Sequence, residues 1–366
     1  MGSVKDLTTS KPAYENEPGK ARFTFSDRYS VFDWGEMPDH IKNKGRALAV
    51  MAAFNFEQLG NAGIRTHYRG LIDSHDKHVN FSGLKEGDNG SDIMEISTAV
   101  VYRPTPRMLS LATPEVSYDY SLFEKNRGAI NNYLLPLEII FRNGLPEGSS
   151  VFKRIEEAKK RESPAERQIA VKDILEGLGL EAEPKPGDML SKPVMNYTTK
   201  LEAGDRNLSN IEAFEISGLT HDNFSRIAST ALRVNDMISK QAEKTGLVHY
   251  DGKVEMLWRN DYPVVCDVVG TFDEDRFGLK GEQVSKEFLR QWYKKSQPDF
   301  SVACDNWKKT GEGWQQRCGI KPIKLDPKLA ELVSQMYMAG CNQYVGKEIF
   351  DAPDLEKVMG KIRPFR

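Results

Sequence analysis

The sequence between residues 247 and 269 contains two strand-like segments joined by a polar turn. The segments are residues 247–257 and 263–269, and Arg259-Asn260-Asp261-Tyr262 lies between them. A turn of this kind between two strand-like runs predicts a β-hairpin. The pairing of the two strands then decides which of their side chains share a face, and therefore where charge gathers in the folded chain.

One face of this hairpin is charged. Because alternate residues of a strand share a face, Asp251, Lys253 and Glu255 are expected to point the same way, and Asp267 on the returning strand is expected near Glu255. Carboxylate oxygens are hard ligands that suit Mg²⁺ beside nucleotide phosphates. Charged strand faces are also common where an antiparallel sheet meets water, so the pattern equally suits a solvated ion pair. Periodicity alone leaves both interpretations open.

The length of the chain, 366 residues, exceeds the usual size of a single hydrophobic core. Two compact lobes, or one domain with appendages, are therefore expected, and a cleft between two lobes would follow. Hydrophobic residues make up 39% of the chain and charged residues 28%, which is typical of a soluble globular protein and unlike a disordered or membrane one.

Composition argues against several other classes of protein. No window approaches the roughly 20 apolar residues of a membrane-spanning helix, and the first residues lack the apolar core of a signal peptide, so a cytoplasmic location is expected. The formal charge of −2 gives no broad basic field for nucleic acid. The cysteines lack C-x-x-C spacing and are interpreted as thiols rather than disulfides or a zinc site. They are Cys266, Cys304, Cys318 and Cys341.

Apolar spacing predicts three long helices. One covers residues 45–60, one begins with Asp222 as its N-cap and ends at Gly246, and one covers residues 328–345. Each has apolar residues three or four positions apart, so each is expected to bury one face.

Two further segments are predicted to be strands, and one to be an insertion. The alternation around Phe23 and Phe25 predicts an edge strand of an antiparallel sheet. Residues 134–142 predict a buried strand that ends in a polar glycine loop. Residues 155–192 are highly charged and then broken by prolines, so a surface insertion is expected there.

Short motifs along the chain occur in one characteristic order, from about residue 26 to residue 292. They are residues 26–33 (SDRYSVFD), Lys44-Gly45, Thr66-His67, Glu138, Arg142-Asn143, Gly148-Ser149, Thr198-Thr199-Lys200, Asp251-x-Lys253-x-Glu255, Asp267, Asp273 and Arg276. This ordered set resembles the phosphoribosylaminoimidazole-succinocarboxamide synthase (SAICAR synthetase) family. Most of the motifs are weak individually, but the set in its order is a strong signal.

The resemblance implies an α+β fold, with antiparallel sheets in two lobes and a nucleotide cleft between them, similar to ATP-grasp and kinase-like clefts. We expect an N-terminal lobe at residues 1–133 and a C-terminal lobe for ATP and substrates at residues 134–300. The second lobe contains the insertion near residues 155–192, and residues 301–366 form a helical C-terminal extension. Homo-oligomerisation stays open.

The resemblance also implies an activity, the ATP-dependent ligation of L-aspartate to the carboxylate of carboxyaminoimidazole ribotide in de novo purine biosynthesis. Transfer of the γ-phosphoryl group would turn the carboxylate into an acyl phosphate, from which the amine of aspartate displaces phosphate. The expected partners are small molecules, namely ATP with Mg²⁺, the imidazole ribotide and L-aspartate, and neither nucleic acid nor a membrane.

The same resemblance assigns roles to the matching positions. The catalytic residues would be Lys200, Lys253 and Asp251. The nucleotide would be bound by Lys5, Leu134, Glu138, Lys200, Glu255 and Asp267, with Glu255 and Asp267 as the Mg²⁺ ligands. The substrates would be bound by Ser30, Lys44, Arg142, Ser149, Asp273 and Arg276. Lysines suit phosphoryl charge, and the arginine fork matches phosphate and carboxylate geometry.

The chain departs from the family pattern near the substrate and phosphate positions. Gly2-Ser3-Val4-Lys5 retains only one cation of an expected Gly-Lys-x-Arg, and Asp205-Arg206 and Val268 replace other family residues. Two alternatives follow: a related ATP-dependent amide ligase for another carboxylate or amine, and an inactive nucleotide-binding regulatory protein. Retention of both metal-ligand carboxylates and two lysines argues against the inactive protein.

Glu274 and Asp275 stand where the family has two hydroxyl residues beside the ribotide-binding arginine. Like charges oppose each other at short range, so a carboxylate there would oppose a phosphate. We expect both side chains to point away, with a nearby cation such as Arg206 neutralising them. The alternative is a neutral or cationic substrate group.

Two isolated residues carry less weight. A histidine at a strand edge, such as His67, is more often structural than catalytic. Ser30 has no partners of the Ser-His-Asp kind in the sequence, so nucleophilic hydrolysis is unsupported.

Overall fold

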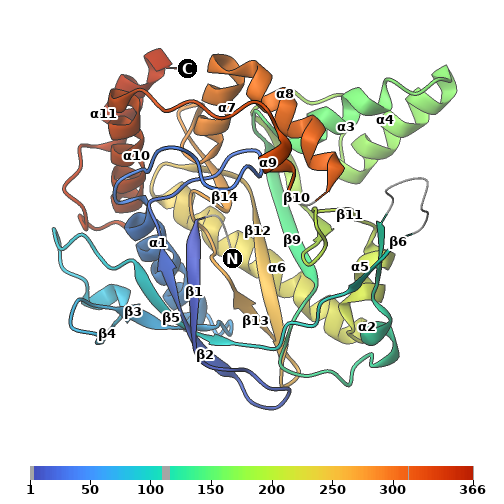
Figure 1. The fold of residues 1–366 in the computed structure, drawn as a ribbon, viewed down its shortest axis with the longest axis horizontal. Helices are drawn as coiled ribbons and strands as arrows, with labels where there is room; N and C mark the ends of the chain where they lie inside the picture. Colours follow the sequence, from blue (N-terminus) through green and yellow to red (C-terminus); the bar gives the residue numbers. More distant parts are fainter. Residues whose placement is uncertain (1–3, 109–115, 312, 366) are drawn as a thin grey trace.

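Two large antiparallel sheets and a small two-stranded one, with helices packed around them, make up the fold (Figure 1). The structure is a computed structural model that describes residues 4–108, 116–311 and 313–365. In that part of the chain, no helix is both long and apolar enough to cross a membrane. The four cysteines are free and buried, as their spacing predicts.

The first sheet contains five strands in the order β1-β2-β5-β3-β4. They are β1 (Lys5–Lys11), β2 (Gly19–Phe25), β3 (Tyr68–Ile72), β4 (His78–Val79) and β5 (Ile93–Thr98). Phe23 and Phe25 lie on the strand predicted around them, but that strand is internal and not an edge, because β1 pairs with it along Lys5 to Lys11. The sequence of β1, KDLTTSK, is polar and largely exposed, so apolar alternation gives no signal for this edge strand.

The second sheet contains eight strands. Six form the order β11-β10-β9-β12-β14-β15. The other two, β8 and β13, pair with the C-terminal part of β12. The strands are β8 (Tyr133–Leu134), β9 (Leu137–Leu145), β10 (Asp188–Thr199), β11 (Asn207–Leu208), β12 (Val248–Arg259), β13 (Tyr262–Cys266), β14 (Asp275–Leu279) and β15 (Glu282–Gln283). A separate two-stranded sheet pairs β6 (Thr105–Met108) with β7 (Val116–Asp119).

The predicted hairpin is confirmed as β12 and β13. Arg259 pairs with Tyr262, and the two residues between them, Asn260 and Asp261, have positive φ of 50° and 60°. Two-residue turns with positive φ at both positions match the twist of paired strands and favour asparagine and aspartate. Glu255 lies opposite Cys266 in this pairing, so Asp267 follows directly, as expected.

The predicted buried strand at residues 134–142 is divided and longer than expected. Pro136 separates β8 from β9, because proline cannot donate a ladder hydrogen bond. β9 continues to Leu145, so the glycine loop begins there and not at Arg142. The extension pairs with β10, since Gly144 lies opposite Met189 and Leu145 lies opposite Asp188.

The helices cover the sheets and form most of the C-terminal part of the chain. They are α1 (Lys44–Asn61), α2 (Ser121–Lys125), α3 (Ser150–Ala158), α4 (Pro164–Leu178), α5 (Asn210–Ser217), α6 (His221–Lys244), α7 (Glu287–Ser296), α8 (Pro298–Trp307), α9 (Trp314–Arg317), α10 (Pro327–Val345) and α11 (Leu355–Ile362). The three predicted helices correspond to α1, α6 and α10. The predicted cap of α6 is wrong: Thr220 is the N-cap and accepts from Asn223 N at 3.4 Å, while Asp222 lies in the first turn.

The predicted insertion contains α4 and only the end of α3, and these two helices extend from the rest of the fold at the upper right of Figure 1. Their own apolar cluster includes Val151, Ile155 and Leu178. The last residues of the predicted insertion, from Asp188 onward, belong instead to the start of β10, which pairs there with β9.

One large apolar core contains residues from both sheets and from α1, α6, α7 and α10. Polar links also cross it: Tyr344 on α10 donates to Asn55 on α1 at 2.9 Å. The C-terminal helices therefore pack directly against the elements that hold the two sheets together.

Candidate active site

Lysines and carboxylates from both sides of β12 form a dense ion network. Nζ of Lys200, after β10, lies 2.6 Å from Glu255 Oε1 and 3.1 Å from Glu138 Oε1. Nζ of Lys253 lies 2.8 Å from Glu138, 3.6 Å from Glu255 and 3.3 Å from Glu274. The strand register brings these residues together, because β9, β10 and β12 are neighbours in the sheet.

Asp267 joins this network to the first sheet. Nζ of Lys5 on β1 lies 2.6 Å from Asp267 Oδ1. Asp267 has a φ of 63°, a left-handed conformation that costs free energy for a residue other than glycine. Its carbonyl accepts from Nε2 of buried His67 at 3.1 Å, and His67 N donates to the Val265 carbonyl at 2.9 Å. His67 therefore holds the backbone on which Asp267 is presented, a structural role. Burial lowers the pKa of His67 to about 4.

The carboxylates of the network differ in their protonation. Burial, and after it the nearby Asp267, raise the pKa of Glu255 to about 7 against the opposing effect of Lys200 and Lys253. Burial also disfavours ionisation of Asp267, but Lys5, Lys200 and Lys253 outweigh it and hold the pKa of Asp267 below its ordinary value. The pKa of Lys200 is raised, because Glu255 and other carboxylates outweigh its own desolvation. At neutral pH the lysines are charged, and Glu255 is poised to gain or lose a proton.

A second group of charges lies in a row across three neighbouring strands. The register places Arg142 on β9 opposite Asp251 on β12, and Asp251 opposite Arg276 on β14. Arg276 Nε donates to Asp251 Oδ1 at 2.7 Å, and Arg142 Nη1 donates to Asp251 Oδ2 at 3.3 Å. Arg142 Nη2 also donates to Ser150 Oγ at 3.2 Å. Asp251 therefore fixes two arginine forks at one place.

Two cavities meet at Asp267. The larger, about 600 Å³, is lined by the predicted site residues Lys5, Ser30, Glu138, Arg142, Lys200, Asp251, Lys253, Asp267, Asp273 and Arg276. The other, about 440 Å³, is more apolar and lies between the first sheet and strands β8, β12 and β13. Leu134 and Glu255 line this second cavity, and Asp267 lines both.

Two predicted substrate residues are not among those that line either cavity. Lys44 is fully buried, and its Nζ lies 2.6 Å from Asp273 Oδ2. Tyr337 donates to the other oxygen of Asp273 at 2.8 Å. Ser149 caps α3 by accepting from Val151 N at 3.4 Å, and the neighbouring Ser150 faces the cavity instead.

The Lys44-Gly45 motif has a packing explanation. A Cβ at position 45 would lie 2.6 Å from the Phe25 carbonyl oxygen, so only glycine allows α1 to start so close to β2. The Asp27 carboxylate accepts two backbone hydrogen bonds: Oδ2 accepts from Asn43 N at 3.2 Å, and Oδ1 accepts from Gly45 N at 3.1 Å. The loop and the helix start are thus fastened to each other.

The expectation for the acidic pair beside Arg276 is not met, because Glu274 and Asp275 both line the larger cavity and Arg206 pairs with neither of them. Glu274 pairs with Lys253, and Asp275 Oδ1 lies 3.0 Å from Nε2 of His249 in the interior. Burial raises the pKa of Asp275 to about 6. Arg206 pairs with Glu202 and Glu212 instead.

Sequence reasoning missed the cations that α7 and the residue before it supply. Lys286, Glu287 and Arg290 line the larger cavity, and Arg290 Nη1 donates to Glu287 Oε2 at 3.0 Å. Burial lowers the pKa of Lys286, and Arg290 lowers it further against the opposing effect of Asp273. The charges three and four positions apart along this helix were a visible signal of one polar face.

The donor set around Asp267 fits a magnesium ion held together with phosphates. Within the described residues no group of three or more histidine, cysteine, aspartate or glutamate side chains is placed to hold a metal. Mg²⁺ usually takes one or two protein carboxylates and completes its shell with phosphate oxygens and water. Glu255 supplies a buried carboxylate and Asp267 a half-buried one, and four carboxylates of the network face only three lysines.

A mixed α+β fold with antiparallel sheets and an ion-rich double cavity defines an enzyme of the class that handles anionic substrates. The chain matches the family described as SAICAR synthetase over residues 9–305. It is 31% identical to the phosphoribosylaminoimidazole-succinocarboxamide synthase of Thermoplasma acidophilum over 74% of this chain and 77% of that protein. An Archaeoglobus fulgidus protein, provisionally given the same name, is 40% identical over 99% of both chains.

The chain belongs to the SAICAR synthetase family. The family and the ligase activity in purine biosynthesis that the motifs indicate are thereby confirmed.

Solved structures confirm the fold class. The structure titled SAICAR-synthase from Saccharomyces cerevisiae complexed SAICAR superposes with a TM-score of 0.59 at 20% identity, covering 95% of this chain and 94% of that one. A SAICAR synthetase in complex with ADP superposes with a TM-score of 0.52 at 18% identity, covering 88% and 99%.

Proposed function

We propose that this enzyme uses ATP and Mg²⁺ to join L-aspartate to the carboxylate of carboxyaminoimidazole ribotide. The observation that supports this most is the position of Asp267, which borders the apolar cavity on one side and the arginine-bearing cavity on the other. A triphosphate that crosses this border would pass the lysines and enter the cavity that holds the substrates.

The nucleotide would occupy the apolar cavity and the border. Leu134, with Val100 and Leu257, offers an apolar wall for the adenine ring. Lys5 and Lys200 would then face the triphosphate, where ammonium groups offset its charge. Glu255 and Asp267 would hold Mg²⁺, which when bound neutralises charge on the transferring phosphoryl group.

The ribotide would occupy the larger cavity. Arg142 and Arg276 present forks that match phosphate or carboxylate oxygens, and both are oriented by Asp251. Ser150 adds a hydroxyl at Arg142. Asp273, Ser30 and Lys286 line the rest of this cavity, where aspartate would approach. Lys44 and Ser149 do not line this cavity and would affect the substrates indirectly. Lys44 would do so by holding Asp273 through their ion pair, and Ser149 by capping α3.

The chemistry assigned to the chain's own residues is electrostatic. A carboxylate is a poor acceptor for an amine, and phosphorylation gives it a good leaving group. Lys200 and Lys253 would neutralise charge as the γ-phosphoryl group moves, and Glu138 and Glu274 would orient those lysines. The expected lobes at residues 1–133 and 134–300, the extension at 301–366 and a cytoplasmic location remain part of the proposal.

An omission assay tests the proposed function. ADP is measured with the full chain, ATP, Mg²⁺, the imidazole carboxylate ribotide and L-aspartate, and then with each component left out in turn. Amide product is expected to match ADP one for one and to require all components. Amide formation without ATP consumption would overturn the ligase. Turnover with another amine but not with aspartate would favour the alternative ligase.

A further inference from the structure

A third cavity, which the proposed reaction does not use, lies behind the wall of the larger one. Its volume is about 520 Å³, within the roughly 300–1,000 Å³ of small-molecule sites. The wall consists of α7 and the loop at residues 146–150. Pro146 and Glu147 of the loop face this third cavity, whereas Gly148 and Ser150 face the reaction cavity.

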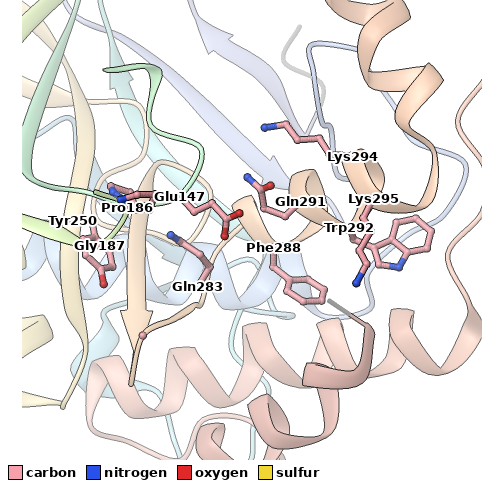
Figure 2. A pocket seen from close by; sticks show the side chains of 12 residues that line it. Glu147, Pro186, Gly187, Tyr250, Gln283, Phe288, Gln291, Trp292, Lys294 and Lys295 are labelled. Carbon is pink, nitrogen blue, oxygen red and sulfur yellow. The ribbon is translucent and has the colours of Figure 1, made fainter. Parts of the chain in front are cut away.

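Aromatic residues line the third cavity. Phe288 and Trp292 on α7 are 3% and 9% exposed, and Tyr250 on β12 lies on the opposite side (Figure 2). Aromatic side chains bind flat rings by stacking and by edge-to-face contact. The cavity therefore favours a flat ring over an extended or branched aliphatic ligand.

Polar side chains converge between these aromatic walls. Figure 2 shows the ends of Glu147, Gln283 and Gln291 gathered in the middle of the cavity. Among the described residues Oε1 of Gln283 has no hydrogen-bond partner and is shielded from solvent. A glutamine amide offers a donor beside an acceptor and pairs with a ring edge that offers the same pair, as the edge of adenine does.

One polar chain passes through the wall from the third cavity to the reaction cavity. Nε2 of Gln291 donates to Glu287 Oε1 at 2.6 Å, and Glu287 Oε2 accepts from Arg290 at 3.0 Å. The loop lies directly against this chain, because a Cβ at Gly148 would be 2.1 Å from Glu287 Oε1. A ligand that hydrogen-bonds to Gln291 would therefore act on Glu287 and Arg290, which line the reaction cavity.

We propose that the third cavity is an effector site for a purine or aminoimidazole ring with a donor and an acceptor on one edge, coupled to the reaction cavity through Gln291 and Glu287. The ring would lie between Tyr250 and Phe288, with its edge at Gln283. An anionic substituent would reach toward Lys294, an exposed residue of the last turn of α7 at the cavity mouth.

Equilibrium dialysis of radiolabelled adenosine monophosphate (AMP) against the full chain tests the site. Wild type is expected to bind one more equivalent of AMP per chain than Gln283→Leu binds. This difference is expected whether or not AMP also enters the nucleotide cavity. Turnover of Gln283→Leu without AMP is expected to equal that of wild type. Equal stoichiometry in wild type and Gln283→Leu would overturn the site, independently of the proposed reaction.

A charge variant at the surface keeps this test independent of folding. Lys294→Gln is expected to weaken AMP binding at this site up to about fivefold, the range of an exposed ion pair, and to leave adenosine binding unchanged. Lys244→Gln is the matched control, since Lys244 is also an exposed lysine in the last turn of a helix. Equal AMP affinity in Lys294→Gln, Lys244→Gln and wild type would overturn the placement of the anion. Free inosine monophosphate and aminoimidazole carboxamide ribotide, used as competitors, distinguish the two ring classes.

The coupling has its own test, which rests on the proposed function because the ribotide is its readout. The Kd of the ribotide is measured with and without saturating AMP, and the Kd of AMP with and without ribotide. Linkage requires both to change by the same factor, and about fivefold or more is expected. The factor by which AMP alters the ribotide Kd should be one in Gln283→Leu and closer to one than in wild type in Gln291→Leu. An unchanged ribotide Kd in wild type, or the same change in Gln283→Leu, would overturn the coupling.

Discussion

Nζ of Lys5 lies 2.6 Å from Oδ1 of Asp267, so the first strand of the chain is joined to the end of the hairpin more than 250 residues later. The side chain of Asp267 is 18% exposed and that of Lys5 is 15% exposed, so water screens this pair only partly. The pair lies where the apolar and the arginine-bearing cavities meet. Strand β1 is otherwise polar and largely exposed, and it contributes to the site through Lys5.

Lys5→Met should lower turnover on the order of 10²-fold, because one preorganised cation facing the triphosphate is lost. The KM for ATP should rise as well. Lys11→Met is the matched control, since Lys11 lies on the same strand but pairs with Glu17, far more exposed than Asp267. Steady-state kinetics of both variants give the comparison. Equal losses in the two would mean that strand β1 matters only for folding.

Asp267→Asn and Glu255→Gln should each reduce turnover on the order of 10²-fold or more and leave the fold intact, because each removes a proposed Mg²⁺ ligand. Asp261→Asn, in the exposed turn of the same hairpin, should behave as wild type. Turnover is compared at saturating Mg²⁺, and circular dichroism reports the fold. Near-normal activity in both site variants would leave the hairpin face a structural ion network only.

Arg276→Lys should raise the KM for the ribotide about tenfold, because a lysine keeps the charge but cannot form the paired contacts of the guanidinium fork. Arg276→Ala should raise it further. Arg226→Ala, an exposed arginine on α6 that donates to the Asp261 carbonyl, is the control and should leave the KM unchanged. An unaltered ribotide KM in Arg276→Ala would instead favour a ligase for a different carboxylate.

Lys44→Met should destabilise the fold by about 3–5 kcal/mol, the range for breaking a buried ion pair and leaving one charge unpaired. The Asp273 carboxylate would keep its hydrogen bond from the Tyr337 hydroxyl but lose its ion pair with Lys44. Lys280→Met is the control, because Lys280 and Glu356 are 68% and 67% exposed and such pairs contribute little. Urea unfolding measures both. A loss below 1 kcal/mol in Lys44→Met would show that Asp273 is neutral or rehydrated.

Much of the fold was visible in the sequence because its strongest elements carry local signals. The hairpin of β12 and β13 has apolar strands and a turn of Asn260 and Asp261, which accept positive φ. The helix α6 repeats apolar residues every three or four positions. Strand β1 carried no such signal, since its role depends on pairing with β2 and on Lys5, both of which are long-range features.

The site was partly predictable for a similar reason. Alternation along β12 places Asp251 and Lys253 in the same cavity, and the motif order supplies Arg142, Lys200 and Arg276. Lys44 was expected at the substrate but is fully buried, because burial depends on how α1 packs against Asp273 and α10. The choice between Ser149 and Ser150 depends on which serine caps α3, and two adjacent serines look alike in sequence.

The central claim is that phosphate leaves with an oxygen that belonged to the ribotide carboxylate. If the carboxylate is labelled with ¹⁸O and the reaction is run with ATP and L-aspartate, attack on the γ-phosphorus forms a bond between a labelled oxygen and phosphorus. The bond from that phosphorus to the bridging oxygen breaks, and ADP leaves. Displacement by the amine then breaks the bond between that oxygen and the acyl carbon. Mass spectrometry of the released phosphate should show one ¹⁸O per amide formed, whereas unlabelled phosphate alongside amide product would contradict the account.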